Sequence, residues 1–305
     1  MSVIWRRHSW GDTMDILEKR PWIMIVLGVL GVSLSSIFVK YSEAPSAVTA
    51  AWRLAWTVAL MTPAVFGSAS VRRELFGMGR RLLLLSILSG LFLAAHFATW
   101  FESLLHTSVA SSTTIVSTEV IWVSLGWWLV LKGKLSGKAM AAIAVTFLGS
   151  VLIALADRGS AGHLKGDLLA LVAAIAVAVY VLIGRVARQT LSTSVYTYTV
   201  YSACALALTV LCAVQGQSLF AHGWSPVIVG LLLSVFSTIL GHSIFSWCLK
   251  FFSPAYVSAS KLCEPVVAAV LAVFLFGEVP GPLLIGGSAL ILGGVLYYTY
   301  LEASK

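Results

Sequence analysis

The hexapeptide FLGSVL at residues 147–152 returns 144 positions later as ILGGVL at residues 291–296. At an offset of 146, the pair at residues 95–96 (AH) matches the pair at 241–242 (GH), and residues 118–119 (TE) fall on 264–265 (EP). The matches keep one order along the chain. The sequence therefore predicts two structurally similar halves, residues 21–156 and 164–301.

The composition is that of a membrane protein. Of 305 residues, 59% are hydrophobic and 10% are charged, and the mean hydropathy is +0.95. Soluble domains carry about 25% charged residues, so these few charges do not cover the surface of water-exposed cores. The net charge of +8 lies in short basic clusters between long apolar runs. That pattern suits the surface of a lipid bilayer better than a nucleic-acid partner.

The apolar runs have the length of transmembrane helices, which need about 20 residues. The predicted helices span residues 21–42, 46–67, 80–104, 107–131, 136–156, 164–187, 192–214, 224–250, 254–276 and 280–301. Each half contains five of them, and because five is odd, the second half must enter the membrane from the opposite face. We therefore predict an all-α membrane protein with ten transmembrane helices as two inverted five-helix repeats. This architecture is typical of secondary transporters with a site near the membrane midplane.

Basic residues predict the orientation. With the N-terminus in the cytoplasm, the cytoplasmic loops and ends hold 15 Lys and Arg residues against three outside, and this bias places both termini inside. The expected parts are a cytoplasmic segment (1–20), the first repeat (21–156), a periplasmic linker (157–163), the second repeat (164–301) and a cytoplasmic tail (302–305). Residues 1–20 carry no small-residue cleavage site before an apolar core, so the first helix is expected to be a retained anchor.

Several motifs match a known family. They are AHFATW at 95–100, TSVASS at 107–112, GH at 241–242, WCLK at 247–250, EPV at 264–266 and FGE at 276–278. Their order and spacing resemble the EamA branch of the drug/metabolite transporter superfamily over residues 21–301. The resemblance implies an inner-membrane exporter or exchanger of small metabolites, with a central cavity lined mainly by helices 1, 3, 4, 6, 8 and 9. The family usually has proline where this chain has Glu119, and Gly-Glu where it has Gly133-Lys134.

Two carboxylates are expected at membrane depth. Charges inside spans cost about 2.5–3.5 kcal/mol on insertion scales and usually face a cavity or a partner. Glu119 and Glu264 sit near the middle of helices 4 and 9. Each is either a coupling carboxylate for protons or substrate, or part of a buried ion pair or hydrogen bond. We favour coupling for Glu119 and a structural pair for Glu264, since Lys261 lies three residues before it on the same face.

Pro265 predicts a distortion of helix 9. Proline removes the hydrogen bond that would reach the carbonyl of Lys261, four residues back, and a freed carbonyl at membrane depth needs another partner. The segment is either a gating kink or a fixed bend.

Two histidines and two tryptophans follow the repeat. His96 and His242 either carry protons beside a cavity or bridge two helices through hydrogen bonds. Trp100 and Trp247 lie four and five residues later, and either stack on a substrate or serve in packing and interfacial belts.

The remaining charges in the spans are basic. Lys40, at the end of helix 1, either contributes to the cavity or snorkels to the outer interface. Arg53, about eight residues into helix 2, is expected to pair with Glu43 or a neighbouring helix rather than bind substrate. Ala289 and Gly293 are spaced for close packing in helix 10 and for a homodimer face.

Together these features predict a secondary transporter for a small amino-acid-like or drug-like metabolite, acting as an exporter or proton-coupled antiporter. The alternatives are an uncoupled facilitator and an intramembrane enzyme that uses histidine and glutamate groups. No metal or cofactor is expected, because no CxxC motif, H-E-x-x-H motif or nucleotide-binding G-x-x-x-x-G-K-[ST] loop occurs.

Overall fold

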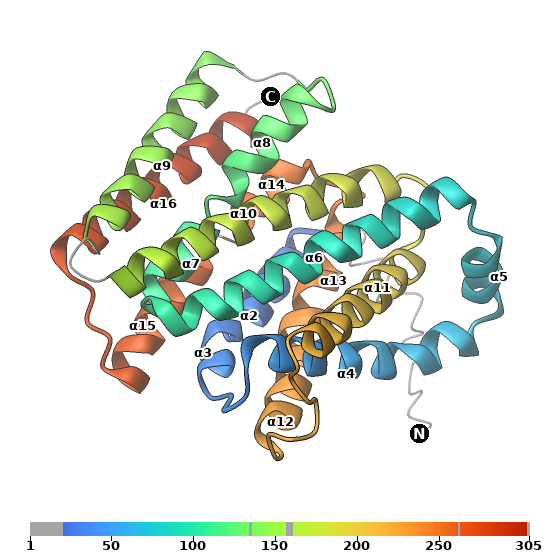
Figure 1. The fold of residues 1–305 in the computed structure, drawn as a ribbon. Helices are drawn as coiled ribbons and strands as arrows, with labels where there is room; N and C mark the ends of the chain where they lie inside the picture. Colours follow the sequence, from blue (N-terminus) through green and yellow to red (C-terminus); the bar gives the residue numbers. More distant parts are fainter. Residues whose placement is uncertain (1–20, 134–135, 157–160, 262, 304–305) are drawn as a thin grey trace, which may run out of the picture.

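The computed structural model describes residues 21–133, 136–156, 161–261 and 263–303, in which every regular element is helical (Figure 1). The helices are α2 (Pro21–Ser33), α3 (Ser35–Lys40), α4 (Ser46–Gly67), α5 (Ala69–Gly77), α6 (Arg80–His106), α7 (Val109–Val116), α8 (Glu119–Leu129), α9 (Gly137–Ala156), α10 (Ala161–Ala187), α11 (Thr193–Val214), α12 (Ser225–Leu232), the π-helix η1 (Leu233–His242), α13 (Ser243–Cys248), α14 (Pro254–Ser260), α15 (Cys263–Phe276) and α16 (Pro282–Ala303).

Four helices that the sequence predicts as continuous are divided. Helix 1 becomes α2 and α3, helix 4 becomes α7 and α8, helix 8 becomes α12, η1 and α13, and helix 9 becomes α14 and α15. In helix 4 the cause is a run of hydroxyl side chains that bond the preceding turn. Ser117 Oγ donates to the Thr113 carbonyl at 2.9 Å, and Thr118 Oγ1 donates to the Ile115 carbonyl at 2.7 Å. Such bonds compete with the helical backbone pattern.

Among the described residues, five helices are long and apolar enough to cross a membrane: Ile23–Lys40, Arg80–His106, His163–Ala187, Thr193–Val214 and Ser225–Cys248. A sixth span would combine α4 and α5, which are bent by 106° relative to one another. Shorter apolar helices cover Gly137–Thr146, Val267–Phe276 and Pro282–Tyr298. The described part of the chain is thus all-helical, and its apolar helices are those of a multi-pass membrane protein.

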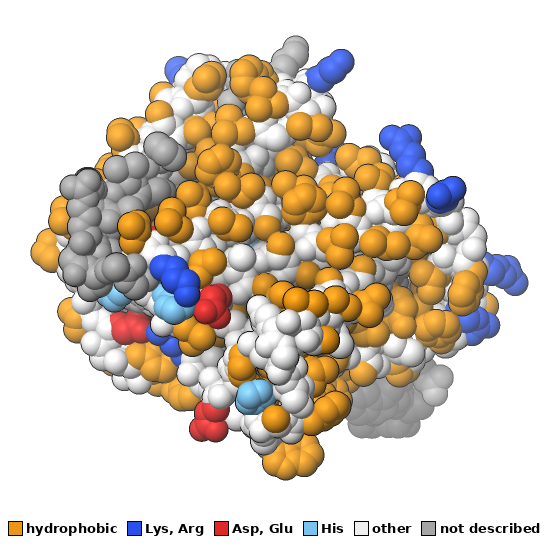
Figure 2. All heavy atoms as spheres, in the orientation of Figure 1, with side chains coloured by type: hydrophobic (Ala, Val, Ile, Leu, Met, Phe, Trp, Pro, Cys, Tyr) orange, Lys and Arg blue, Asp and Glu red, His pale blue; other side chains and the backbone are white. Residues whose placement is uncertain are grey.

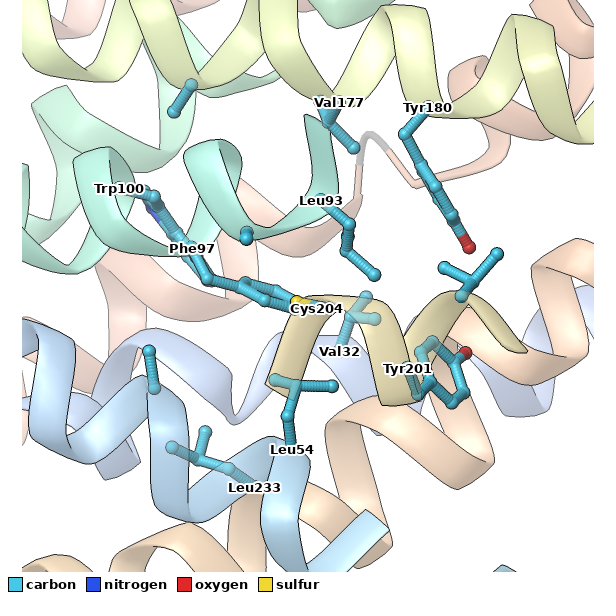
Figure 3. Packing of buried hydrophobic residues seen from close by; sticks show 14 of the residues in the cluster. Val32, Leu54, Leu93, Phe97, Trp100, Val177, Tyr180, Tyr201, Cys204 and Leu233 are labelled. Carbon is cyan, nitrogen blue, oxygen red and sulfur yellow. The ribbon is translucent and has the colours of Figure 1, made fainter. Parts of the chain in front are cut away.

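The core lies where the helices of the two halves meet. α6 packs along α10, α4 along α11, and α2 along η1, while α9 and α16 form a pair to one side (Figure 1). Figure 3 shows buried side chains from six of these elements converging, among them Val32 of α2, Phe97 of α6 and Cys204 of α11. Close contact of α6 with α11 depends on Gly90, where an added Cβ would lie 2.5 Å from the Val200 carbonyl oxygen.

Small residues in helix 10 also permit close packing, but at a different position from the expected one. At Gly294 an added Cβ would collide with Thr146 of α9, whereas at Gly293 it would meet open space. The packing partner of this face is therefore α9 of the same chain, since Gly294 rather than Gly293 points toward it.

Charged side chains gather at two opposite edges of the visible face in Figure 2. Most of the visible Lys and Arg lie along the upper and right edges, and the visible Asp, Glu and His lie toward the lower left together with a few Lys or Arg, with apolar side chains between the two groups. An apolar band between two polar edges is the surface that a bilayer requires.

Candidate functional site

The candidate site lies where two broken spans, α7–α8 and α14–α15, pack against one another near the centre of the molecule. α7 contacts α15 and α8 contacts α14, so the four half-helices are mutually packed. Glu119 is the first residue of α8, and Glu264 lies in the first turn of α15. The N-terminal end of a helix carries a partial positive charge that stabilises a carboxylate. Each break therefore stabilises a negative charge that would otherwise be costly at this depth.

Lys261 lies at the break between α14 and α15. Its ammonium group contacts Glu119 Oε1, and the two side chains are 13% and 6% exposed. The expected partner was Glu264 on the same helix, but the helix breaks at Lys261, so its side chain reaches the other broken span instead. The Lys261 carbonyl, which Pro265 was expected to free, accepts the backbone N–H of Glu264 at 2.9 Å. The side chain of Pro265 lies outside the described residues.

Arg53 of α4 is the largest completely buried side chain of this region. Its Nε donates to Thr238 Oγ1 of η1 at 2.8 Å, and its Nη1 donates to Ser35 Oγ of α3 at 3.2 Å. The guanidinium carbon lies 4.1 Å from the centre of the Phe97 ring, a favourable cation–π geometry. Its neighbours are thus hydroxyls of helices 1 and 8 rather than Glu43, which is exposed. The charge inside a span was the only sequence signal for this position.

The two histidines lie on facing helices. His96 Nδ1 is 3.0 Å from the Ala173 carbonyl oxygen of α10, and the His96 ring stacks on Trp100 with 5.6 Å between ring centres. His242, the last residue of η1, has its ring centre 6.3 Å from that of His96. Both imidazoles are therefore held between helices and also face the same space.

These side chains surround a small cavity of about 30 Å³, adjoining a second one of about 20 Å³. Six of the eight side chains predicted to form the cavity line one or both: His96, Trp100, Glu119, His242, Lys261 and Glu264. Arg53 lines the first cavity as well. Volumes of this size hold one or a few water molecules. As formed by the described residues, the two cavities are therefore smaller than a metabolite.

Three buried polar atoms around the cavities have no hydrogen-bond partner among the described residues: Arg53 Nη2, Trp100 Nε1 and Ser258 Oγ. Two are donors only, and the third can donate or accept. Buried polar groups without partners are unfavourable, by about 1–3 kcal/mol each, so these atoms favour the entry of a polar ligand.

Lys40 and Trp247 lie away from this cavity. Lys40 Nζ is 3.2 Å from Glu278 Oε1, and Glu278 Oε2 accepts the backbone N–H of Val109 at 2.7 Å. These contacts join helix 1, the loop before α16 and the start of α7 at one end of the molecule. Trp247 lines a polar pocket of about 380 Å³ with Lys250 at the other end. Lys40 ends α3 and Trp247 lies near the end of α13, so helix length keeps both from the centre.

Among the described residues there is no group of three or more His, Cys, Asp or Glu side chains that could hold a metal ion. Cys204, Cys212 and Cys248 are buried free thiols.

Comparison with known proteins shows a similarity to one family of transporters. Residues 164–300 match the model of the EamA-like transporter family. An uncharacterized transporter of Clostridium kluyveri is 24% identical over 201 residues, or 64% of this chain. The match spans 65% of the length of that relative. A solved crystal structure has a TM-score of 0.66, covers 94% of this chain and 98% of its own, and is 18% identical, which shows the fold alone.

The second half of the chain is thus similar to the EamA-like transporter family, and the relative that matches is itself named a transporter. The family is one of transporters, not of enzymes.

Proposed function

We propose that the protein is a secondary active transporter that moves a small amino-acid-like or drug-like metabolite across a bacterial-type inner membrane. It acts by alternating access, as an exporter or a proton-coupled antiporter, with both termini in the cytoplasm. The proposal includes ten spans arranged as two inverted five-helix repeats, 21–156 and 164–301. The family match and the apolar helices support a membrane transporter, and the charged cluster at the two helix breaks is the observation that carries the choice of site.

The charged cluster at the two helix breaks favours a small, polar substrate. Glu119 and Glu264 offer carboxylate oxygens, while Arg53 and Trp100 offer buried N–H groups that have no partner in the described part of the chain. A ligand with both donors and acceptors would satisfy these groups, and the Trp100 ring beside them offers an aromatic wall. A purely apolar ligand would leave the same groups unpaired, which is the usual basis for its rejection.

Alternating access requires that each end of the molecule open in turn, and the described contacts show what would have to separate. At the predicted outer end, Glu278 links Lys40 to the start of α7. At the predicted inner end, Arg188 Nε donates to the Ser246 carbonyl at 3.0 Å, and Arg185 Nη1 donates to the Leu249 carbonyl at 2.7 Å. We infer that the structure represents an occluded state, closed at both ends.

Coupling is assigned to Glu119. Its partner Lys261 belongs to the other half of the chain, so protonation of Glu119, or binding of a substrate charge, would weaken a contact between the halves. A ligand shifts a conformational equilibrium only through different affinities for its states. An ion pair present in one state and absent in another provides such a difference.

The membrane-facing side of α16 completes the proposal for partners. Gly293 faces open space, where a second copy of the chain can approach closely, so a homodimer would place this face at its interface.

A screen for thermal stabilisation of the purified protein by metabolites, followed by flux assays in vesicles, tests the proposal. We expect at least one polar metabolite to stabilise the protein and to cross reconstituted vesicles. Arg53→Lys and Glu264→Gln should reduce both effects, whereas Glu43→Gln, at an exposed carboxylate, should leave them unchanged. Absence of flux for every amino acid, sugar, nucleoside and cationic drug, in either direction and under either pH gradient, would contradict the proposal.

A further inference from the structure

An apolar groove opens on the outside of the helix bundle between α6, α8 and α10, and it is separate from the central cavity. Its volume is about 520 Å³. The main lining side chains are Leu85 of α6, Trp122 and Leu129 of α8, and Ile175, Val179 and Leu182 of α10. α6 and α10 run side by side in Figure 1, and apolar side chains cover this part of the surface in Figure 2.

Gly126 helps to form the groove. A Cβ added at Gly126 of α8 would collide with the Leu182 side chain of α10, so glycine allows the two helices to approach closely here. Because glycine has no side chain, Gly126 also leaves the adjoining part of the groove empty. A substrate route is not favoured by this chemistry, since the lining contains one charged residue, Arg81, and otherwise only apolar residues.

The depth of the groove matches one leaflet of a bilayer. Its lining on α10 extends from Ile175 to Val186, which corresponds to about 16 Å at the helical rise of 1.5 Å per residue. One half of a hydrocarbon core about 30 Å thick is about 15 Å. A single acyl chain entering from the headgroup level would therefore extend along the whole lining as far as Ile175.

One end of the groove carries a basic lining residue and has two more basic residues next to lining residues in the sequence. Arg81 lines the groove, Arg80 precedes it, and Lys132 follows the lining residue Leu131. All three basic side chains are exposed. The bias of basic residues places this end on the cytoplasmic side, where anionic lipids concentrate and clustered basic residues bind their headgroups.

We propose that this groove is a binding site for one anionic phospholipid of the cytoplasmic leaflet. One acyl chain lies along Leu129, Val179 and Leu182, and the headgroup phosphate pairs with Arg81. The lipid fills the space between α8 and α10, and because α8 begins at Glu119, a bound lipid holds this half-helix in place. The inference does not depend on transport activity.

Mass spectrometry of the intact protein, purified in detergent with phosphatidylglycerol or phosphatidylcholine of identical chains, provides the test. The wild type should retain one phosphatidylglycerol at least about ten times more strongly than phosphatidylcholine. Arg81→Gln should reduce retention of phosphatidylglycerol to the level of phosphatidylcholine. Val179→Phe, which fills the groove, should reduce retention of both lipids.

Two control variants carry the same types of substitution at positions outside the groove. Arg73→Gln removes an exposed arginine of α5, and Val172→Phe enlarges an exposed valine of α10; both should behave as the wild type. Equal retention of the two lipids by the wild type, or equal effects of Arg81→Gln and Arg73→Gln, would overturn the headgroup assignment. Full retention by Val179→Phe would overturn the groove as the site.

A second measurement covers the case in which Val179→Phe does not fold. Phosphatidylglycerol with brominated acyl chains, added at one molecule per protein, should quench tryptophan fluorescence in the wild type. The quenching should be weaker in Trp122→Phe, because Trp122 lines the groove. Equal quenching in the two proteins would place the acyl chain elsewhere.

Discussion

Lys261, at the break between α14 and α15, contacts Glu119, the first residue of α8, and so connects the two halves of the chain by a buried ion pair. Each partner lies at an interruption of a span and lines the two small central cavities. The charges that are most costly in a membrane are thereby brought together at the position where the chain is least regular.

Breaking this pair from one side should destabilise the protein. Lys261→Met leaves the Glu119 carboxylate buried without its cation, and losing one partner of a buried pair costs about 3–5 kcal/mol. The double variant Lys261→Met/Glu119→Gln removes both charges and should recover most of the loss. Unfolding of purified protein in detergent measures both.

The matched control is Lys40→Met, at an ion pair whose side chains are 23% and 22% exposed. Partly exposed pairs contribute about 0–1 kcal/mol, so this variant should unfold nearly as the wild type does. If the double variant is as unstable as Lys261→Met alone, the pair is not the source of the loss.

Arg53→Lys should destabilise the protein although the charge is kept. Lysine cannot reproduce the planar fork that bonds Thr238 and Ser35 while stacking on Phe97. Hydrogen bonds to a charged group contribute about 1.5–3 kcal/mol, so a loss of roughly 2 kcal/mol or more is expected in the same unfolding assay. Arg73→Lys on the exposed surface of α5 is the control, and equal stability of the two variants would contradict the role of the guanidinium geometry.

Glu278→Gln should open the predicted outer end. The carboxylate bonds both Lys40 and the backbone N–H of Val109, and its neutral amide retains neither the ion pair nor the charge-assisted bond. Ser35→Cys introduces a cysteine into the cavity, and an impermeant thiol reagent is added from outside. Labelling of this cysteine should be severalfold higher with Glu278→Gln than without it. Protein without Ser35→Cys gives the background labelling of the native cysteines. Glu43→Gln in the same background should not change labelling, and an unchanged rate in Glu278→Gln would exclude this closure.

Gly90→Ala should separate α6 from α11. Its Cβ would lie 2.5 Å from the Val200 carbonyl oxygen, a backbone atom, and overpacking of this kind costs about 1–3 kcal/mol. Gly286→Ala, in open space on α16, is the matched control and should be neutral or slightly stabilising. The midpoints of thermal unfolding of the two variants provide the comparison. Similar midpoints would mean that α6 and α11 accommodate the methyl group without loss of stability.

The central residues were accessible to sequence reasoning because charge inside an apolar span is rare and costly. This signal selected Glu119, Glu264, His96, His242 and Lys261, which the structure places around one cavity. A charge in an apolar span does not indicate how far along the helix the residue lies or toward which neighbour its side chain points. This signal therefore also selected Lys40, which lies toward one end of the molecule. Trp247 was selected by its spacing from His242 instead, and it lies toward the opposite end.

The partners within the site could not be predicted. Thr238 bonds Arg53 across 185 residues of sequence, and a threonine in an apolar helix carries no signal that marks it as a ligand of a charge. Likewise, a helix face pairs Lys261 with Glu264 only if the helix is continuous. The hydroxyl bonds and the proline interrupt helices 4 and 9, and the side chain of Lys261 therefore contacts Glu119 instead of Glu264. Helical periodicity in the sequence does not predict such local interruptions.

Proton-driven movement of a substrate in vesicles, compared between wild type and Glu119→Gln, tests the central claim most directly. Exchange of substrate across the same vesicles reports whether the variant is folded and binds, and Glu43→Gln serves as the control. We predict that Glu119→Gln loses transport driven by a pH gradient but retains exchange. An unchanged dependence on the pH gradient in this variant would contradict the assignment of coupling to Glu119.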